Sequence, residues 1–241
     1  MNAPAPFLAA PFLEVRDLHA WYGESHVLHG VSFTVHEGEV VTLLGRNGAG
    51  RTSTLRAIMG LTGSRKGSVC IRGTQTIGMP THRIARLGLG YCPEERGIFA
   101  SLSAGENLLL PPVLSGGGMS LEEIHDMFPN LRERATSQGT RLSGGEQQML
   151  AVARILRTGA RLLLLDEISE GLAPVIVQKL AEMVTTLRTR GYTIVMVEQN
   201  FRFAAPLADR FLVMEHGEVV QEFTQAQLPE RIDGLHQVLG V

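Results

Sequence analysis

Eight residues in the first quarter of the chain have the composition of a loop that binds phosphate. The segment Gly45-Arg46-Asn47-Gly48-Ala49-Gly50-Arg51-Thr52 follows an apolar run, and a helical pattern continues from it to about Met59. Glycines at such a turn allow backbone N–H groups to converge on phosphate oxygens at the start of the helix. The spacing is typical of nucleotide-binding phosphate loops, in which the hydroxyl at the end binds Mg²⁺. We therefore expect this loop and Ser53 to bind a nucleotide, and Thr52 to bind Mg²⁺.

One position departs from the pattern of such loops, because Arg51 stands where a lysine is expected. A lysine places a compact point charge between two phosphates, whereas the guanidinium of arginine is wider and forked. The exchange keeps the positive charge, so we expect nucleotide affinity to survive better than turnover. The alternative is a glycine-rich turn without a ligand, which the strand before it and the helix after it make less attractive.

A second motif consists of a run of four leucines at 162–165 that is followed by two acidic residues. A buried strand that ends in Asp166 would bring this carboxylate beside the phosphate loop, where it can hold the magnesium shell. Glu167 follows directly and would then be placed to polarise an attacking water. Without the phosphate loop upstream, a core strand that merely ends at the surface would be the better interpretation.

The elements that must position these groups predict an α/β domain. The segments Phe12–Leu18 and Val31–Val35 alternate between apolar and polar residues, as half-exposed antiparallel strands do. The runs Val40–Leu44 and Thr193–Val197 are almost wholly apolar, which favours central strands buried on both faces. Further strands are expected at 67–71, 89–92 and 161–166, a helix at 174–190, and a hairpin at 211–220.

The character of the chain changes between about residues 95 and 140. Ser103 and Ser120 each precede a glutamate by three residues, which is the form of a capping box at the start of a helix. Three consecutive glycines lie between these two segments and indicate a connection. We expect a small helical insertion here.

Composition and charge exclude several classes of protein. The net charge of −2 lacks the basic excess of a protein that binds nucleic acid. The two cysteines do not make a disulfide framework, and the histidines show no zinc spacing, so we expect no structural metal. No run approaches the roughly 18–20 apolar residues that span a bilayer. Residues 1–11, rich in proline, are expected to form a flexible arm rather than a signal peptide.

A third motif, Leu142-Ser143-Gly144-Gly145-Glu146-Gln147-Gln148, lies shortly before the acidic strand. It resembles the signature sequence of ABC ATPases, in which Ser143, Gly144, Gly145 and Glu146 would open a helix toward the nucleotide. With the phosphate loop and acidic strand in this order, the resemblance extends from about Phe12 to residue 241. It implies a RecA-like phosphate-loop core, an N-terminal antiparallel β-subdomain and an inserted helical subdomain.

The resemblance also assigns further site residues. Tyr22 occupies the position of the aromatic ring that stacks on adenine in the family. Glu94 stands at the Q-loop glutamine, where members contact Mg²⁺ and the reaction centre, and Gln199 stands where most members have a catalytic histidine. The segment Ser169–Pro174 occupies the D-loop. Glu94 and Arg51, both departures from the family pattern, could compensate each other by pairing.

The D-loop together with Val197-Glu198-Gln199-Asn200 resembles the ATP-binding subunits of branched-chain amino-acid importers. Importers of urea and short amides share these features, and Ile168 stands where the subfamily usually has proline. The resemblance implies ATP and Mg²⁺, a paralogous or identical second ATP-binding subunit, two membrane permease subunits and a periplasmic solute-binding protein. It places the chain peripherally at the cytoplasmic face of the inner membrane.

Three other functions are alternatives to this one. Soluble ABC proteins of DNA repair or translation carry long coiled coils or two cassettes, which this sequence lacks. A phosphate-loop kinase would have no reason to carry the signature sequence. A nucleotide-gated subunit with little catalysis stays open because of Arg51 and Glu94.

Overall fold

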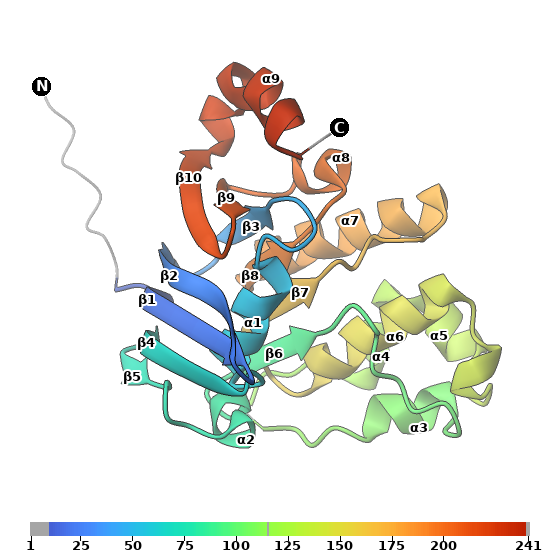
Figure 1. The fold of residues 1–241 in the computed structure, drawn as a ribbon. Coiled ribbons are helices and arrows are strands. Elements are labelled where there is room, and N and C mark those ends of the chain that lie inside the picture. Colours follow the sequence, from blue (N-terminus) through green and yellow to red (C-terminus); the bar gives the residue numbers. More distant parts are fainter. Residues whose placement is uncertain (1–9, 115, 240–241) are drawn as a thin grey trace, which may run out of the picture.

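A computed structural model describes residues 10–114 and 116–239, so most of the expected N-terminal arm lies outside the described residues. Two sheets organise this part of the chain (Figure 1). A four-stranded sheet has the order β2-β1-β4-β5, and a six-stranded sheet has the order β10-β9-β3-β8-β7-β6. The α/β fold with an antiparallel β-subdomain, expected from the sequence, is confirmed.

The four-stranded sheet is antiparallel and has one buried face. Its strands are β1 (Leu13–Tyr22), β2 (Ser25–Val35), β4 (Ser64–Ile71) and β5 (Thr74–Gln75). Alternate residues such as Leu13, Val15 and Val31 are buried, and their neighbours face outward. Sequence alternation located the two long strands, although both run further than the alternating segments.

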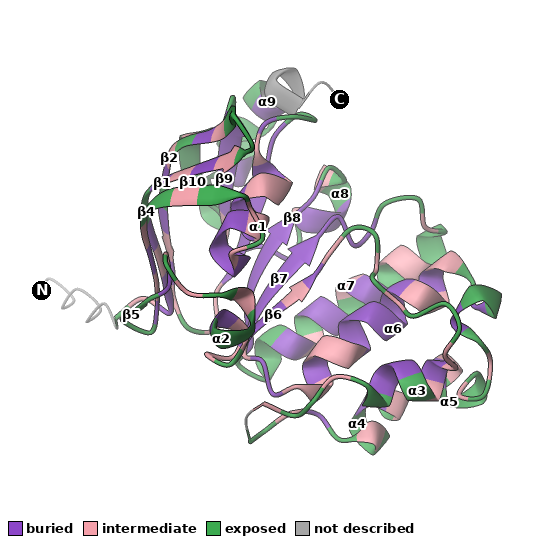
Figure 2. Cartoon of the chain, turned by 60° about the horizontal axis from the view of Figure 1, so that its bottom comes forward, coloured by how far each residue is buried: buried purple, intermediate pink, exposed green. Residues whose placement is uncertain are grey.

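The six-stranded sheet positions the acidic and glycine-rich motifs. Its strands are β3 (Val40–Leu44), β6 (Leu89–Cys92), β7 (Leu162–Asp166), β8 (Thr193–Val197), β9 (Arg210–Glu215) and β10 (Glu218–Thr224). β3, β7 and β8 are buried along their whole length, and Figure 2 shows β7 and β8 in the colour of buried residues. All pairs are parallel except β9 with β10. The carboxyl ends of β3 and β7 therefore meet at one edge of the sheet.

Three longer helices cover this sheet: α1 (Arg51–Met59), α6 (Gly144–Arg157) and α7 (Pro174–Thr189). Each begins with a recognisable signal, namely a left-handed glycine before α1, a capping box at Ser143, and Pro174 in the first turn of α7. Leu150, Leu156, Leu180 and Leu187 from α6 and α7 are wholly buried in one core with β7 and β8.

The stretch between residues 95 and 140 contains α3 (Ala104–Leu109), α4 (Leu121–Met127) and α5 (Pro129–Glu133). The capping boxes at Ser103 and Ser120 are both formed. Asn107 is fully buried, and its amide group donates to three backbone carbonyl groups while its oxygen accepts from the backbone N–H of Phe99. These helices pack with α6 beside the six-stranded sheet (Figure 1).

Three short or peripheral helices had no counterpart in the sequence analysis: α2 (Thr81–Ala85), α8 (Phe201–Ala204) and α9 (Leu228–Leu239). Leu228 and Leu235 of α9 join a small core with Phe211 and Phe223 of the β9–β10 hairpin. Within the described ranges, no helix combines the length and apolarity needed to cross a membrane.

Candidate functional site

The phosphate loop connects the end of β3 to the start of α1. Gly48 and Gly50 have φ values of 82° and 100°, a region that side chains with a Cβ rarely adopt. At Gly45 a Cβ would lie 2.5 Å from the backbone oxygen of Met214 at the end of β9, so this position has no room for one. The backbone of β9 thereby fixes the shape of the loop.

A cavity of about 330 Å³ opens in front of this loop. It brings together the loop, three glutamates from the segments that follow β6 and β7, and a glutamine from the segment that follows β8. Its lining consists of Asn47, Gly48, Gly50, Arg51, Thr52, Ser53, Glu94, Glu167, Glu170 and Gln199. Three of the expected catalytic side chains, Glu94, Glu167 and Gln199, therefore share one cavity with the phosphate loop.

Asp166 lies at the back of this cavity, where β7 ends. Its carboxylate accepts hydrogen bonds from Thr52 Oγ1 and from the hydroxyl of Tyr91, both at 2.9 Å. Burial raises the pKa of Asp166, and these two hydrogen bonds oppose the shift. The hydroxyl and the carboxylate are hard oxygen donors of the kind that Mg²⁺ prefers, so this donor set fits the expected metal.

Glu167 is held between two side chains. Its Oε1 accepts from Arg51 Nη2 at 3.0 Å, and its Oε2 accepts from Gln199 Nε2 at 3.0 Å. Its φ of 48° is unusual for a residue with a side chain, and its backbone N–H donates to the carbonyl of Val197. The position at which a catalytic carboxylate was expected is thus oriented from both sides.

Arg51 is buried and forms an ion pair with Glu167 rather than with Glu94. Its side chain is 4% exposed and also donates to the Glu198 carbonyl at 2.9 Å and to Asn47 Oδ1 at 3.3 Å. Among the described contacts of Arg51 none involves Glu94, so the pairing considered from the sequence is wrong. Glu167 is buried like Arg51, whereas Glu94 is exposed, so the buried guanidinium pairs with the buried carboxylate.

Glu94, Glu167 and Glu170 place one carboxylate oxygen each within 4.8 Å of one another. A hydrogen bond with Glu167 is the main reason that the pKa of Glu170 is raised to about 7, and burial and the charges of Glu167 and Glu94 add to it. Glu170 was recognised in the sequence only as part of the D-loop. Three acidic groups in one phosphate-binding cavity need cations to balance them, and Arg51 supplies one.

Glu198 is a site residue that the sequence analysis did not single out. It is 1% exposed, accepts from Ser169 Oγ at 2.7 Å and from the Ser169 backbone N–H at 3.2 Å, and follows strand β8. Burial raises its pKa to about 7. Its position after an apolar strand beside β7 was the available signal, since residues at the ends of adjacent parallel strands meet.

We predict that Glu198→Gln removes a pH-dependent penalty on stability. Because the folded-state pKa of Glu198 is raised from 4.5 to about 7, its contribution to stability is complete below pH 4.5 and is lost as the pH rises through 7. As the pH rises from 5 to 8, the unfolding free energy of the variant should increase by on the order of 2 kcal/mol relative to that of the parent. Urea denaturation at both pH values measures this, with the exposed Glu133→Gln as control. Equal pH slopes for parent and Glu198→Gln would contradict the prediction.

Tyr22 lies at the end of β1 and does not line the cavity in front of the phosphate loop. It is 37% exposed. The pKa of Arg56 is raised mainly by a hydrogen bond with Tyr91 and to a smaller extent by one with Tyr22. Because Arg56 belongs to α1, Tyr22 lies beside this helix. A base bound against Tyr22 would therefore extend outward from the cavity over α1.

The residues Ser143, Gly144, Gly145 and Glu146 form the first turn of α6 and do not line the same cavity. Ser143 and Glu146 cap the helix reciprocally, and Arg96 contacts this turn by donating to Gln147. A Cβ on Gly145 would lie 2.8 Å from Ile176 at the start of α7. The structure thus presents this turn separately from the chain's own phosphate loop.

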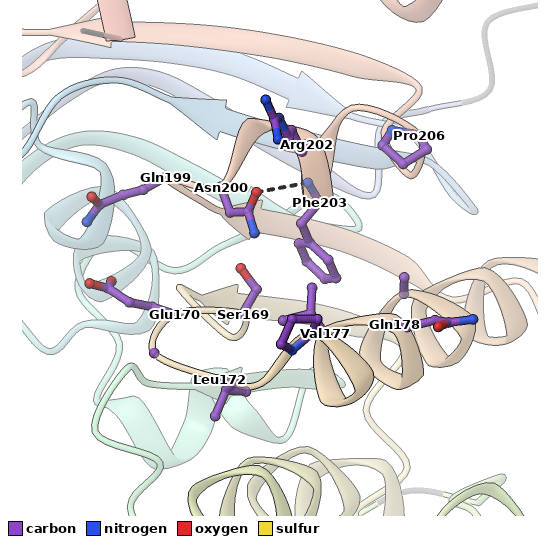
Figure 3. Close-up of a pocket in the computed structure, with 13 residues that line it drawn as sticks. Ser169, Glu170, Leu172, Val177, Gln178, Gln199, Asn200, Arg202, Phe203 and Pro206 are labelled. Atoms are coloured by element: carbon purple, nitrogen blue, oxygen red, sulfur yellow. Dashed lines mark hydrogen bonds between the residues drawn. The ribbon is translucent and has the colours of Figure 1, made fainter. Parts of the chain in front are cut away.

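A larger groove, of about 810 Å³, adjoins the phosphate-loop cavity. Glu170 and Gln199 line both, and Figure 3 shows them at one end of the groove with Gln178 and Pro206 at the other. Asn200 Oδ1 caps α8 by accepting from the Phe203 N–H at 3.2 Å (Figure 3). Residues of the segment Ser169–Pro174 therefore line this groove, and Glu170 among them also reaches the phosphate-loop cavity.

Comparison with known sequences agrees with this geometry. The sequence model of the family described as ABC transporter matches residues 28–170. The chain is 40% identical over 211 residues to the high-affinity branched-chain amino acid transport ATP-binding protein BraG of Pseudomonas aeruginosa, covering 86% of this chain and 91% of BraG. It is 33% identical over 217 residues to the lipopolysaccharide export system ATP-binding protein LptB of Acidithiobacillus ferridurans, covering 86% and 88%.

Solved structures of ABC transporter ATP-binding proteins are also similar to this chain. One described as the ATP binding subunit of an ABC transporter superposes with a TM-score of 0.80 at 27% identity, covering 95% of this chain and all of that one. The ATP-binding cassette MJ0796, a dimer in a post-hydrolysis state with ADP and Pi, superposes with a TM-score of 0.78 at 25% identity. That alignment covers 88% of this chain and 98% of the cassette.

Proposed function

Because the chain belongs to the ABC transporter family as an ATP-binding subunit, we propose that it hydrolyses ATP to drive import of branched-chain amino acids. The observation that carries the hydrolytic part is the convergence of Arg51, Thr52 and Glu167 in one cavity, with Asp166 bonded to Thr52 behind it. The resemblance of the D-loop and of residues 197–200 to branched-chain amino-acid importers supports the solute, as does the likeness to BraG.

In this proposal each group has one task. The N–H groups of the phosphate loop bind the phosphate oxygens at the start of α1. Glu167 orients the attacking water and accepts its proton. Gln199 keeps Glu167 in place through its hydrogen bond, and Glu94, with a carboxylate oxygen within 4.8 Å of one of Glu167, is a further acceptor toward the water.

Thr52 and Asp166 would hold Mg²⁺, which supplies positive charge to the phosphates of bound ATP. Both oxygens already face each other at 2.9 Å, so little movement of either side chain is needed. Tyr91 fixes the second carboxylate oxygen of Asp166. Preorganised groups of this kind avoid reorganisation during the reaction.

The site is proposed to be completed by a second ATP-binding subunit. The turn at Ser143–Glu146 lies outside the chain's own cavity, so it is free to contact nucleotide held by a partner arranged head to tail. Two permease subunits and a periplasmic solute-binding protein would complete the importer, with this chain at the cytoplasmic face of the inner membrane.

Uptake into proteoliposomes tests the solute. The assembled importer should take up radiolabelled leucine in an ATP-dependent manner, and the same vesicles with Glu167→Gln should not. Uptake of urea or a short amide instead of leucine would reject the amino-acid assignment while leaving the ATPase assignment intact.

We further propose that this chain's site is the slower of two in a heterodimer. The Arg51–Glu167 ion pair favours this, because ATP must separate the two groups before each acts on phosphate or water. Arg51→Lys replaces the fork with a point charge that holds Glu167 less firmly, so ATP turnover of the assembled transporter should rise severalfold. An unchanged rate would mean that the site is adapted to arginine, and the slow-site proposal would be dropped.

A further inference from the structure

Three histidines and the chain's one tryptophan gather on the outer face of β1 and β2, away from the nucleotide cavity. His19 lies opposite His29 in the ladder, and Trp21 lies opposite His26. The rings of Trp21 and His26 are stacked, with centroids 4.3 Å apart at an angle of 9°. The centroid of His26 is also 4.1 Å from that of His29 and 5.2 Å from that of His19.

A β-bulge creates this cluster. Ala20 pairs with Leu28 and Trp21 pairs with His26, so Val27 is an extra residue on β2. In a regular strand, residues three positions apart face opposite sides, and His26 and His29 would be separated by the sheet. The bulge restores both to the outer face, so the cluster cannot be recognised from the spacing of these residues alone.

The two nearest nitrogen atoms have the separation of ligands that share a metal. His19 Nδ1 and His26 Nε2 are 3.1 Å apart. Two imidazole nitrogens bound to one tetrahedral Zn²⁺ at about 2.0–2.1 Å lie roughly 3.3 Å from each other. Without a metal the same contact is an N–H···N hydrogen bond, so a cation would replace one proton with little movement of the rings.

The other nitrogen of His19 is also engaged. Asp17 Oδ1 lies 3.2 Å from His19 Nε2, an arrangement in which a carboxylate orients a metal-binding histidine and increases its basicity. Lys66 is a nearby positive charge that would repel a cation, and its Nζ lies 5.7 Å from the centroid of the Trp21 ring. Within the described residues, the three glutamates of the nucleotide cavity are the group of three possible metal ligands whose ligand atoms all lie within 4.8 Å of one another. The histidine site as it stands therefore offers two ligands, His19 and His26.

We propose that His19 and His26 bind a divalent transition-metal cation of the class that prefers imidazole, such as Zn²⁺, Ni²⁺ or Cu²⁺. Imidazole suits these ions, and Cu²⁺ binds most strongly in this series. The cation links β1 to β2 near the end of β1, three residues before Tyr22. This proposal does not depend on the transported solute or on ATP hydrolysis.

Trp21 makes the site directly measurable. It is the one tryptophan in the chain, and its ring contacts His26, so paramagnetic Cu²⁺ bound there should quench its fluorescence. Titration of the full chain with Cu²⁺, without nucleotide, should give saturable quenching at one equivalent, and Zn²⁺ should compete. His19→Ala and His26→Ala should each weaken Cu²⁺ binding at least tenfold, as measured by calorimetry.

His82→Ala is the matched control, because His82 is exposed on α2 and lies outside the cluster. Its affinity for Cu²⁺ should equal that of the parent, and far-ultraviolet circular dichroism checks that all variants fold. Retention of Cu²⁺ affinity within twofold in both His19→Ala and His26→Ala would overturn the proposal. So would an equal loss in His82→Ala, or the absence of saturable quenching in the parent.

Discussion

Glu167→Gln in the assembled transporter is expected to lower ATP turnover by about 10²–10⁴-fold, the usual contribution of a positioned general base. The amide has nearly the same shape and can still accept a hydrogen bond from Arg51, so the cavity should keep its form. It cannot take the proton of the attacking water. ATP should therefore bind and stay bound, and a stable dimer with trapped nucleotide should accumulate.

Glu170→Gln provides the matched control for this experiment. Glu170 lines the same cavity, and its carboxylate approaches those of Glu94 and Glu167. Because Glu170 lies four residues after Asp166 and not directly after it as Glu167 does, replacement of Glu170 should reduce turnover less than tenfold. Wild-type turnover in Glu167→Gln, measured as phosphate release alongside size-exclusion chromatography, would show that another group serves the water.

Arg51→Met is expected to impair both nucleotide binding and stability. The variant lacks the cation that donates to Glu167 and to the Glu198 carbonyl. Loss of charged hydrogen bonds to phosphate should weaken ATP binding about 100-fold or more. Removal of one partner from a buried ion pair should lower the unfolding free energy by about 3–5 kcal/mol.

The stability loss in Arg51→Met should depend on pH. Arg51 holds down the pKa of Glu198, which burial raises to about 7. Without the cation that pKa rises further, so the share of the loss that comes from Glu198 grows as the pH increases above 7 and is smallest near pH 5. Thermal unfolding at pH 5 and pH 8 measures the difference, and a loss independent of pH would contradict this explanation.

A double variant separates the two effects of Arg51. Arg51→Met with Glu167→Gln removes both members of the buried pair and leaves no unpaired carboxylate at position 167. Its unfolding free energy should exceed that of Arg51→Met alone, whereas its ATP affinity should stay low. If the second substitution restores no stability, the ion pair between Arg51 and Glu167 contributes little to the fold.

The parts of the site that could be foreseen follow from backbone geometry. Glycine spacing identified the turn before α1, because only such residues suit the φ of Gly50 and the close approach at Gly45. The end of a buried parallel strand placed Asp166 near Thr52. Capping boxes marked the starts of α3 and α4, since Ser103 and Ser120 satisfy helix N–H groups locally.

The parts that could not be foreseen depend on side-chain reach and on irregular pairing. Whether Arg51 pairs with Glu94 or Glu167 is decided by three-dimensional position, since both carboxylates are far away in the sequence. The extra Val27 that unites His26 with His29 interrupts the alternation on which strand prediction rests. Helix α9 is held by contacts of Leu228 and Leu235 with the β9–β10 hairpin rather than by a strong local signal.

ATP turnover as a function of assembly tests the central claim most directly. Phosphate release should be measured for the isolated chain, verified as a dilute monomer, and again after addition of the partner ATP-binding subunit and the permease subunits. Because the turn at Ser143–Glu146 lies outside the chain's own cavity, the monomer should hydrolyse ATP poorly and the assembly should be many times faster. Full activity in the monomer would contradict the account.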